Sequence, residues 1–159
     1  MTPSSFEIAL FLHLLGTLAF VSGMAVAGVC FEAARRRSTS MEIAMLLSLT
    51  RSGVLLVVVG AVVAGACGLW LASLSTLSLH TEWVWLSAAL FVASVVLGAL
   101  GGRRPRQART LAHAEGSADA DAPPSARLRR LLDDPASRAC NHLAAVALLV
   151  IVYLMVTRP

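Results

Sequence analysis

Four long runs of apolar residues, separated by polar stretches, organise this chain. The runs lie at about 6–31, 53–74, 83–100 and 138–156. A helix needs about 20 mostly apolar residues to cross the hydrocarbon layer of a bilayer, and helices are required because lipid cannot satisfy exposed backbone groups. The pattern therefore predicts an all-α fold, an integral membrane four-helix bundle that forms a single transmembrane domain over residues 1–159.

Local signals place several helix ends outside the apolar runs. Thr39 and Glu42 have the spacing of a capping box, so the second helix should begin near Ser40 and exceed the bilayer thickness. Asp134 is a suitable N-cap, and Pro135 follows in the first helical position, where its missing N–H costs nothing. The predicted helices are about 6–31, 40–74, 83–100 and 135–157.

The segment between the third and fourth helices, about 103–133, differs from the rest of the chain. Gly101 and Gly102 should end the third helix before it. The middle of the segment, from Glu115 to Ser125, has no apolar periodicity, so a flexible cytoplasmic loop is expected. Its flanks carry arginines next to the membrane helices, which is an arrangement that attracts anionic lipid headgroups.

Charge and composition fix the expected location. The chain is 57% hydrophobic and only 14% charged, with a mean hydropathy of +0.77, which is too apolar for an ordinary soluble domain. Twelve of its thirteen arginines lie in or beside the first and third connections, and short basic loops stay cytoplasmic. We therefore expect a multi-pass protein of the cell inner (plasma) membrane with both termini on the outer side. The same rule explains the pI near 9.8, so no nucleic-acid partner is expected.

Few polar groups lie at membrane depth, where they are costly and often functional. His13 lies about 10 Å below the outer end of the first helix, and Thr17 shares its face one turn later. Asn141 and His142 lie two turns into the fourth helix from the cytoplasmic side. The two histidines thus fall in opposite leaflets, which argues against one haem held between them. His13, Thr17 and His142 are candidate cofactor-binding residues, and hydrogen bonding between helices is the alternative role for each histidine.

The first helix carries a pattern that known membrane proteins share. In the run His13-Leu14-Leu15-Gly16-Thr17-Leu18-Ala19-Phe20-Val21-Ser22-Gly23, a His is followed after six residues by an aromatic residue, and then by a small residue and Gly. This run resembles the first-helix signature of a broad group of small bacterial membrane proteins. The group includes CopD-like copper-resistance domains, the HemJ type of protoporphyrinogen oxidase and a family of predicted integral membrane proteins of unknown function. The four-helix plan and the ending Met155-Val156-Thr157-Arg158-Pro159 are most similar to the last of these.

The resemblance also implies candidate cofactors. HemJ-like proteins are thought to bind haem through the first-helix His and an intramembrane Lys, which would place haem b at His13. This chain has no lysine, and Phe20 stands where the group usually has Trp. CopD-like copper handling would require Met and His ligands at the outer face, and only His13 and His80 lie near it. A haem- or quinone-associated redox protein is therefore the alternative function, and copper handling is a third.

The residue patterns give no support to an enzyme. The sequence has no phosphate-binding glycine loop, serine nucleophile elbow, paired-carboxylate site or zinc spacing. Small residues at four-residue spacing, such as Ala19, Gly23 and Ala27, predict closely packed helices. We therefore expect a non-catalytic structural or accessory subunit that packs against other membrane protein subunits or against copies of itself.

Overall fold

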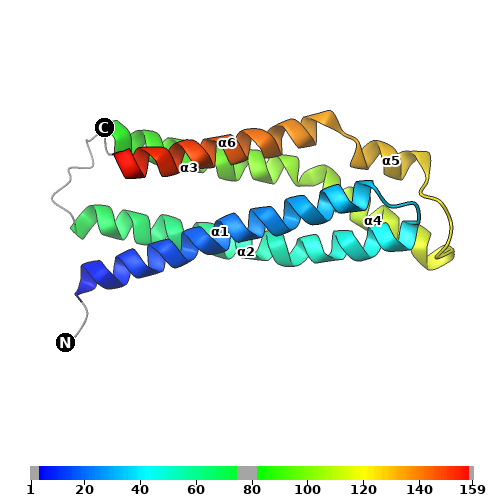
Figure 1. The fold of residues 1–159 in the computed structure, drawn as a ribbon, viewed down its shortest axis with the longest axis horizontal. Coiled ribbons are helices and arrows are strands. Elements are labelled where there is room, and N and C mark those ends of the chain that lie inside the picture. Colours follow the sequence, from blue (N-terminus) through cyan, green and yellow to red (C-terminus); the bar gives the residue numbers. More distant parts are fainter. Residues whose placement is uncertain (1–3, 75–81, 158–159) are drawn as a thin grey trace. The chain divides into compact units, whose positions relative to one another are not determined.

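The computed structural model describes residues 4–74 and 82–157, which form six α-helices and no strand (Figure 1). The helices are α1 (Ser5–Arg35), α2 (Ser40–Leu74), α3 (Glu82–Gly101), α4 (Arg103–Ala118), α5 (Ala126–Leu132) and α6 (Pro135–Thr157). Four stretches are long and apolar enough to cross a membrane: Ser5–Arg35, Ser40–Leu74, Val84–Ala118 and Ala126–Thr157. The predicted all-α membrane fold is confirmed.

Side-chain caps begin two of the long helices. The backbone N–H of Glu42 donates to Oγ1 of Thr39 at 3.4 Å, immediately before the first residue of α2. The N–H of Ser137 donates to Oδ2 of Asp134 at 3.0 Å, and Pro135 is the first residue of α6. Each bond satisfies one of the backbone donors that a helix leaves free in its first turn.

Two compact units make up the chain. Unit 1 is Met1–Val29 with Leu49–Thr81, and unit 2 is Cys30–Ser48 with Glu82–Pro159. Unit 1 therefore holds most of α1 and α2. Unit 2 holds the end of α1, the first turns of α2 and all of α3 to α6.

In unit 1, α1 and α2 pack backbone against backbone. A Cβ added to Gly23 would lie 2.6 Å from the carbonyl oxygen of Gly53, and one added to Gly60 would lie 2.7 Å from that of Gly16. Glycine is required at these positions because no side-chain atom fits between the helices. On each helix the two glycines are seven residues apart, which is the heptad spacing of helices that cross at a shallow angle.

In unit 2, α3 and α6 lie side by side and meet closely at the glycine that ends α3 (Figure 1). Pro105 has no N–H, so it cannot donate to the carbonyl of Gly101 four residues earlier. The hydroxyl of Ser137, which is 4% exposed, donates to that carbonyl instead. A Cβ on Gly101 would lie 3.1 Å from Cγ of Asn141 and 3.2 Å from the backbone carbonyl oxygen of Ser137, so a side chain there would require at least Asn141 to move.

The segment predicted as a flexible loop at 103–133 contains two helices, α4 and α5, so that prediction was wrong. Both helices pack on the end of α1 and the start of α2 around one buried core, which we call the cap core. Its buried members are Phe31, Ala34, Ile43, Ala44, Leu47, Ala108, Ala112, Leu128 and Leu132. The side of α4 that is buried carries only alanine and glycine, and such small residues give a weak hydrophobic pattern in the sequence.

The connection between α4 and α5 is anchored by hydrogen bonds. The backbone N–H of Ser40 donates to the carbonyl of Ala122 at 3.1 Å. The carboxylate of Glu115 accepts from the Ser40 hydroxyl at 3.2 Å and from the Ser125 N–H at 3.1 Å. Ser125 also caps α5 by accepting from the N–H of Leu128. These bonds hold a segment whose composition alone indicated a loop without fixed contacts.

Candidate functional site

His13 makes a hydrogen bond between helices inside unit 1. Its Nδ1 lies 2.8 Å from the carbonyl oxygen of Ala64 on α2. A carbonyl can only accept, so Nδ1 carries the proton and Nε2 of the neutral ring keeps its lone pair. Gly68 makes room for the ring, because a Cβ there would lie 3.2 Å from Cε1 and 3.3 Å from Nδ1. An imidazole fixed in this tautomer by a backbone carbonyl is also the arrangement by which proteins hold metal-ligating histidines.

The structure brings together two of the three predicted site residues. Thr17 lies one turn after His13 on α1, and its hydroxyl donates to the His13 carbonyl at 2.8 Å. His142 lies on α6 in unit 2, where its Nδ1 is 2.7 Å from the carbonyl of Arg138 one turn earlier. In contrast to the His13 ring, the hydroxyl of Thr17 donates its proton to a carbonyl of its own helix, α1. His80, named above with copper, lies outside the described residues.

A partly buried arginine joins the end of α1 to the end of α5. Arg35 donates from Nε and Nη2 to Oδ1 of Asp133 at 3.1 and 2.8 Å, and from Nη1 to Oε2 of Glu32 at 2.9 Å. Its side chain is 18% exposed, so water screens this guanidinium less than it screens an isolated surface pair. The network fixes the position of α5 relative to α1 within unit 2.

A second arginine, Arg129, caps the C-terminus of α1. It donates to the carbonyl of Arg35 at 2.8 Å and also to the carbonyl of Arg37. The last carbonyls of a helix have no partner within the helix, and a guanidinium satisfies them and their partial negative charge. The amphipathic spacing of Leu128 and Leu132 could have indicated α5 in the sequence, but nothing local indicates which of its arginines turns inward.

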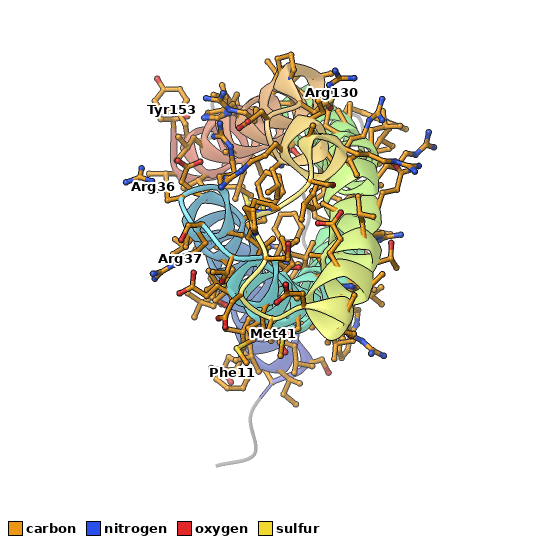
Figure 2. All side chains as sticks on the ribbon, turned by 90° about the vertical axis from the view of Figure 1, so that its right-hand side faces the viewer. Phe11, Arg36, Arg37, Met41, Arg130 and Tyr153 are labelled. Carbon is orange, nitrogen blue, oxygen red and sulfur yellow. The ribbon has the colours of Figure 1, made fainter. Side chains whose placement is uncertain are left out.

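The end of unit 2 that carries these networks also presents arginines outward. Figure 2 shows the side chains of Arg36, Arg37 and Arg130 extending away from the ribbon. Arg36 and Arg37 have half or more of their side chains exposed and pair only at the surface, with Glu32 and Glu42. This end of the molecule, which we call the basic cap, is therefore a folded element with a buried core and a cationic surface. It comprises the end of α1, the start of α2, α4 and α5.

The comparisons with known proteins identify a family for this chain. No curated protein and no solved structure is significantly similar to this chain. The model of a family described as predicted integral membrane protein (DUF2269) matches residues 7–159, nearly the whole chain. The chain therefore belongs to this family of predicted integral membrane proteins.

Proposed function

We propose that the protein is a non-catalytic subunit of the inner membrane, which packs against other membrane proteins through its spans and presents the basic cap at the cytoplasmic face. The observation that supports this proposal is the arrangement of the arginine side chains in the basic cap. Arg35 and Arg129 are used to lock α5 onto α1, and other arginines are left on the outer surface. A rigid cationic surface next to membrane helices suits contact with anionic lipids and with acidic surfaces of a partner subunit.

The membrane-facing surfaces support the same role. Leu18 on α1, Leu149 on α6 and Val156 on α6 are 67%, 69% and 78% exposed. Apolar side chains of this kind can pack against lipid or against the helix of another subunit. Cross-linking in native membranes distinguishes the two.

A photocrosslinking scan tests the subunit role. We expect a photoreactive residue at Leu18, Leu149 or Val156 to form a protein adduct of defined mass in native membranes. Leu154, on the buried side of α6 at 8% exposure, is the matched control and should give none. A scan of the exposed positions in all four spans that yields no adduct with any protein would overturn the proposal.

The orientation is tested separately, in a variant whose three cysteines are replaced by alanine. An impermeant thiol reagent added from outside should label Ser4→Cys and miss Ser117→Cys, both of which are exposed positions. The physical reason is that arginine-rich connections resist translocation. The reverse labelling pattern would move the basic cap to the outer face.

A redox protein is the second candidate function, and the geometry of His13 favours it. The bond from Nδ1 to the Ala64 carbonyl orients the ring and leaves Nε2 able to bind a haem iron. The residues fit this cofactor in part. In the described part of unit 1, His13 is the only histidine, so a second residue to hold the haem would have to be of another type or come from elsewhere.

The substitution His13→Ala separates the two functions. As a purely structural hydrogen bond, His13 should contribute about 0.6 kcal/mol to the free energy of unfolding, so the variant should fold. If the protein binds haem through His13, the purified wild type made with ample haem should show a Soret band that the variant lacks. A colourless wild type would exclude the haem-binding role and leave the structural one.

A further inference from the structure

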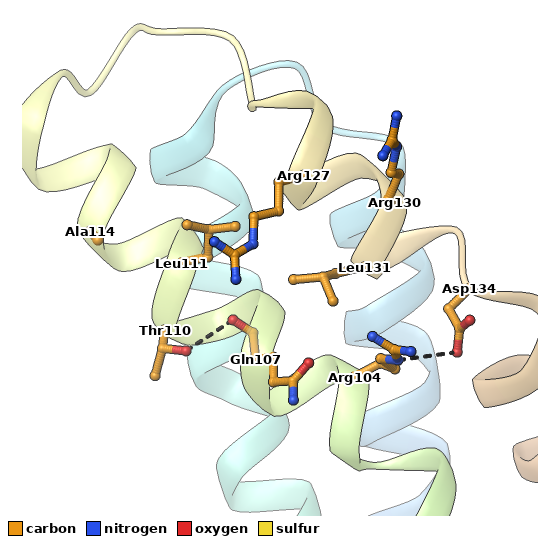
Figure 3. Close-up of a pocket in the computed structure, with 9 residues that line it drawn as sticks. All are labelled: Arg104, Gln107, Thr110, Leu111, Ala114, Arg127, Arg130, Leu131 and Asp134. Atoms are coloured by element: carbon orange, nitrogen blue, oxygen red, sulfur yellow. Dashed lines mark hydrogen bonds and ion pairs between the residues drawn. The ribbon is translucent and has the colours of Figure 1, made fainter.

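A cavity of about 750 Å³ lies on the basic cap between α4 and α5 (Figure 3). Its polar lining comes from both helices and from the residue that caps α6: Arg104, Gln107, Thr110, Arg127, Arg130 and Asp134. Figure 3 shows Arg127 reaching from α5 toward α4 beside Leu111, whereas Arg130 points away from α4. The residues that line the cavity all belong to unit 2, whereas His13 belongs to unit 1.

The charges around this cavity are not balanced by the protein. The guanidinium groups of Arg104 and Arg127 line it, against one carboxylate, that of Asp134, while Arg130 contributes to the lining with its guanidinium turned away from α4. This carboxylate already accepts from the N–H of Ser137, and Nε of Arg104 is 3.9 Å from it. Among the described residues, Arg127 and Arg130 have no carboxylate within 4.0 Å, unlike Arg35. An anion bound between these like charges would reduce their mutual repulsion.

We propose that this cavity binds the phosphate group of an anionic ligand. Arg104 and Arg127 would hold the phosphate, because a guanidinium donates two parallel hydrogen bonds to phosphate oxygens. The amide of Gln107 supplies a neutral donor in the same lining. The hydroxyl proton of Thr110 is already donated to the Gln107 carbonyl at 2.9 Å, so Thr110 lines the cavity without donating to the ligand.

The position of the cavity favours a membrane lipid as the source of the phosphate. Arg104 follows the end of the apolar helix α3 by three residues, and Asp134 directly precedes α6. At about 1.5 Å per residue, Arg104 lies about 5 Å beyond the end of α3, at the level of lipid headgroups. Leu111 and Leu131 add apolar side chains to the lining, which suit the glycerol and acyl parts of a lipid. The inference rests on the proposed contact of the basic cap with anionic lipids, and it names the site of that contact.

Native mass spectrometry of the whole protein, with dioctanoyl phosphatidylglycerol as the probe, tests the lipid source. The double variant Arg104→Gln with Arg127→Gln should bind the first lipid at least about tenfold more weakly than the wild type. The matched control is Arg103→Gln with Arg106→Gln, which removes the same charge from exposed positions of α4 outside the cavity and should bind as the wild type does. Arg127→Lys keeps the charge but loses the two-fold hydrogen bonding, so it should bind with an intermediate affinity.

A second titration tests a soluble source, with glycerol 3-phosphate added to protein in phosphatidylcholine nanodiscs. Binding there that is weakened by the cavity variant alone supports the site with a soluble phosphate as its ligand. Equal weakening by both double variants in both titrations would overturn the cavity as a site, while leaving the general attraction to anionic lipids intact. No binding of either probe to the wild type would overturn both the cavity and the proposed lipid contact.

Discussion

Replacing Gly60 by alanine should separate α1 from α2 and lower the free energy of unfolding by about 1–3 kcal/mol. The added methyl group would lie 2.7 Å from the Gly16 carbonyl oxygen and 2.8 Å from Cα of Phe20. Both are backbone atoms, so no side-chain rotation can relieve the overlap. The separation can be measured in liposomes by energy transfer between dyes at Ser4 and Ser73, which lie at the ends of the two helices in unit 1.

Gly28→Ala is the matched control for this prediction. No described atom lies within 4 Å of a Cβ placed there, although Gly28 lies on the same helix as Gly16. Alanine is the better helix former by about 1 kcal/mol, so this variant should be as stable as the wild type or more stable. Equal stability of the Gly60→Ala and Gly28→Ala variants would contradict the close approach of the α1 and α2 backbones at Gly60.

Replacing Leu128 by alanine should open the basic cap. Leu128 is fully buried in the cap core beside Leu47 and Leu132, and a large-to-small change at such a site costs about 2–5 kcal/mol. Because α5 has only seven residues, it has little helical stability of its own and depends on this packing. We expect faster hydrogen exchange throughout α5 and faster tryptic cleavage at Arg127 and Arg130.

Leu149→Ala removes the same atoms from a position that is 69% exposed on α6, so it should leave both rates unchanged. Equal rates for the wild type and the Leu128 variant would contradict a packed cap. They would instead favour the loop that the composition of residues 103–133 suggests.

The membrane spans and two helix starts could be predicted from the sequence because their signals are local. A run of apolar residues identifies a span wherever it lies, and Thr39 and Asp134 cap the helices that follow them directly. The sequence also predicted that α2 is longer than the bilayer thickness, but it did not show what the additional turns pack against. Its first turns are apolar because Ile43 and Leu47 enter the cap core, whose other half lies more than sixty residues later.

The packing of α4 could not be predicted because its contact face contains little hydrophobic surface. Ala108, Ala112 and Gly116 are buried by close approach, and a Cβ on Gly116 would lie 3.1 Å from Cα of Met41.

The predicted row of small residues on α1 lies partly in the contact with α2, since a Cβ on Gly53 would lie 2.9 Å both from the carbonyl oxygen of Gly23 and from the backbone nitrogen of Ala27. The pairing of Gly16, seven residues before Gly23 on α1, with Gly60 was not predicted, because it depends on where α2 lies against α1.

In the candidate site, too, the residue with a local signal could be predicted and the residue selected by tertiary contacts could not. His13 was identified because a polar residue in an apolar run is conspicuous, and hydrogen bonding between helices was one of the two roles considered for it. The inward role of Arg129 was missed, since Arg127, Arg129 and Arg130 are chemically identical in sequence. Only the position of the α1 carbonyls selects one of them.

The order in which the cap core is synthesised has a consequence for biogenesis. Ile43 and Leu47 leave the ribosome well before Ala108 and Leu128, and the whole of α3 lies between them. Until α5 has been made, the apolar start of α2 lacks these packing partners, and Arg129 is not yet present to bind the carbonyls at the end of α1. A nascent chain that stalls before α5 would therefore display apolar surface to chaperones and proteases. Closure of the cap thus has to wait for α5, which is made after α1 to α4.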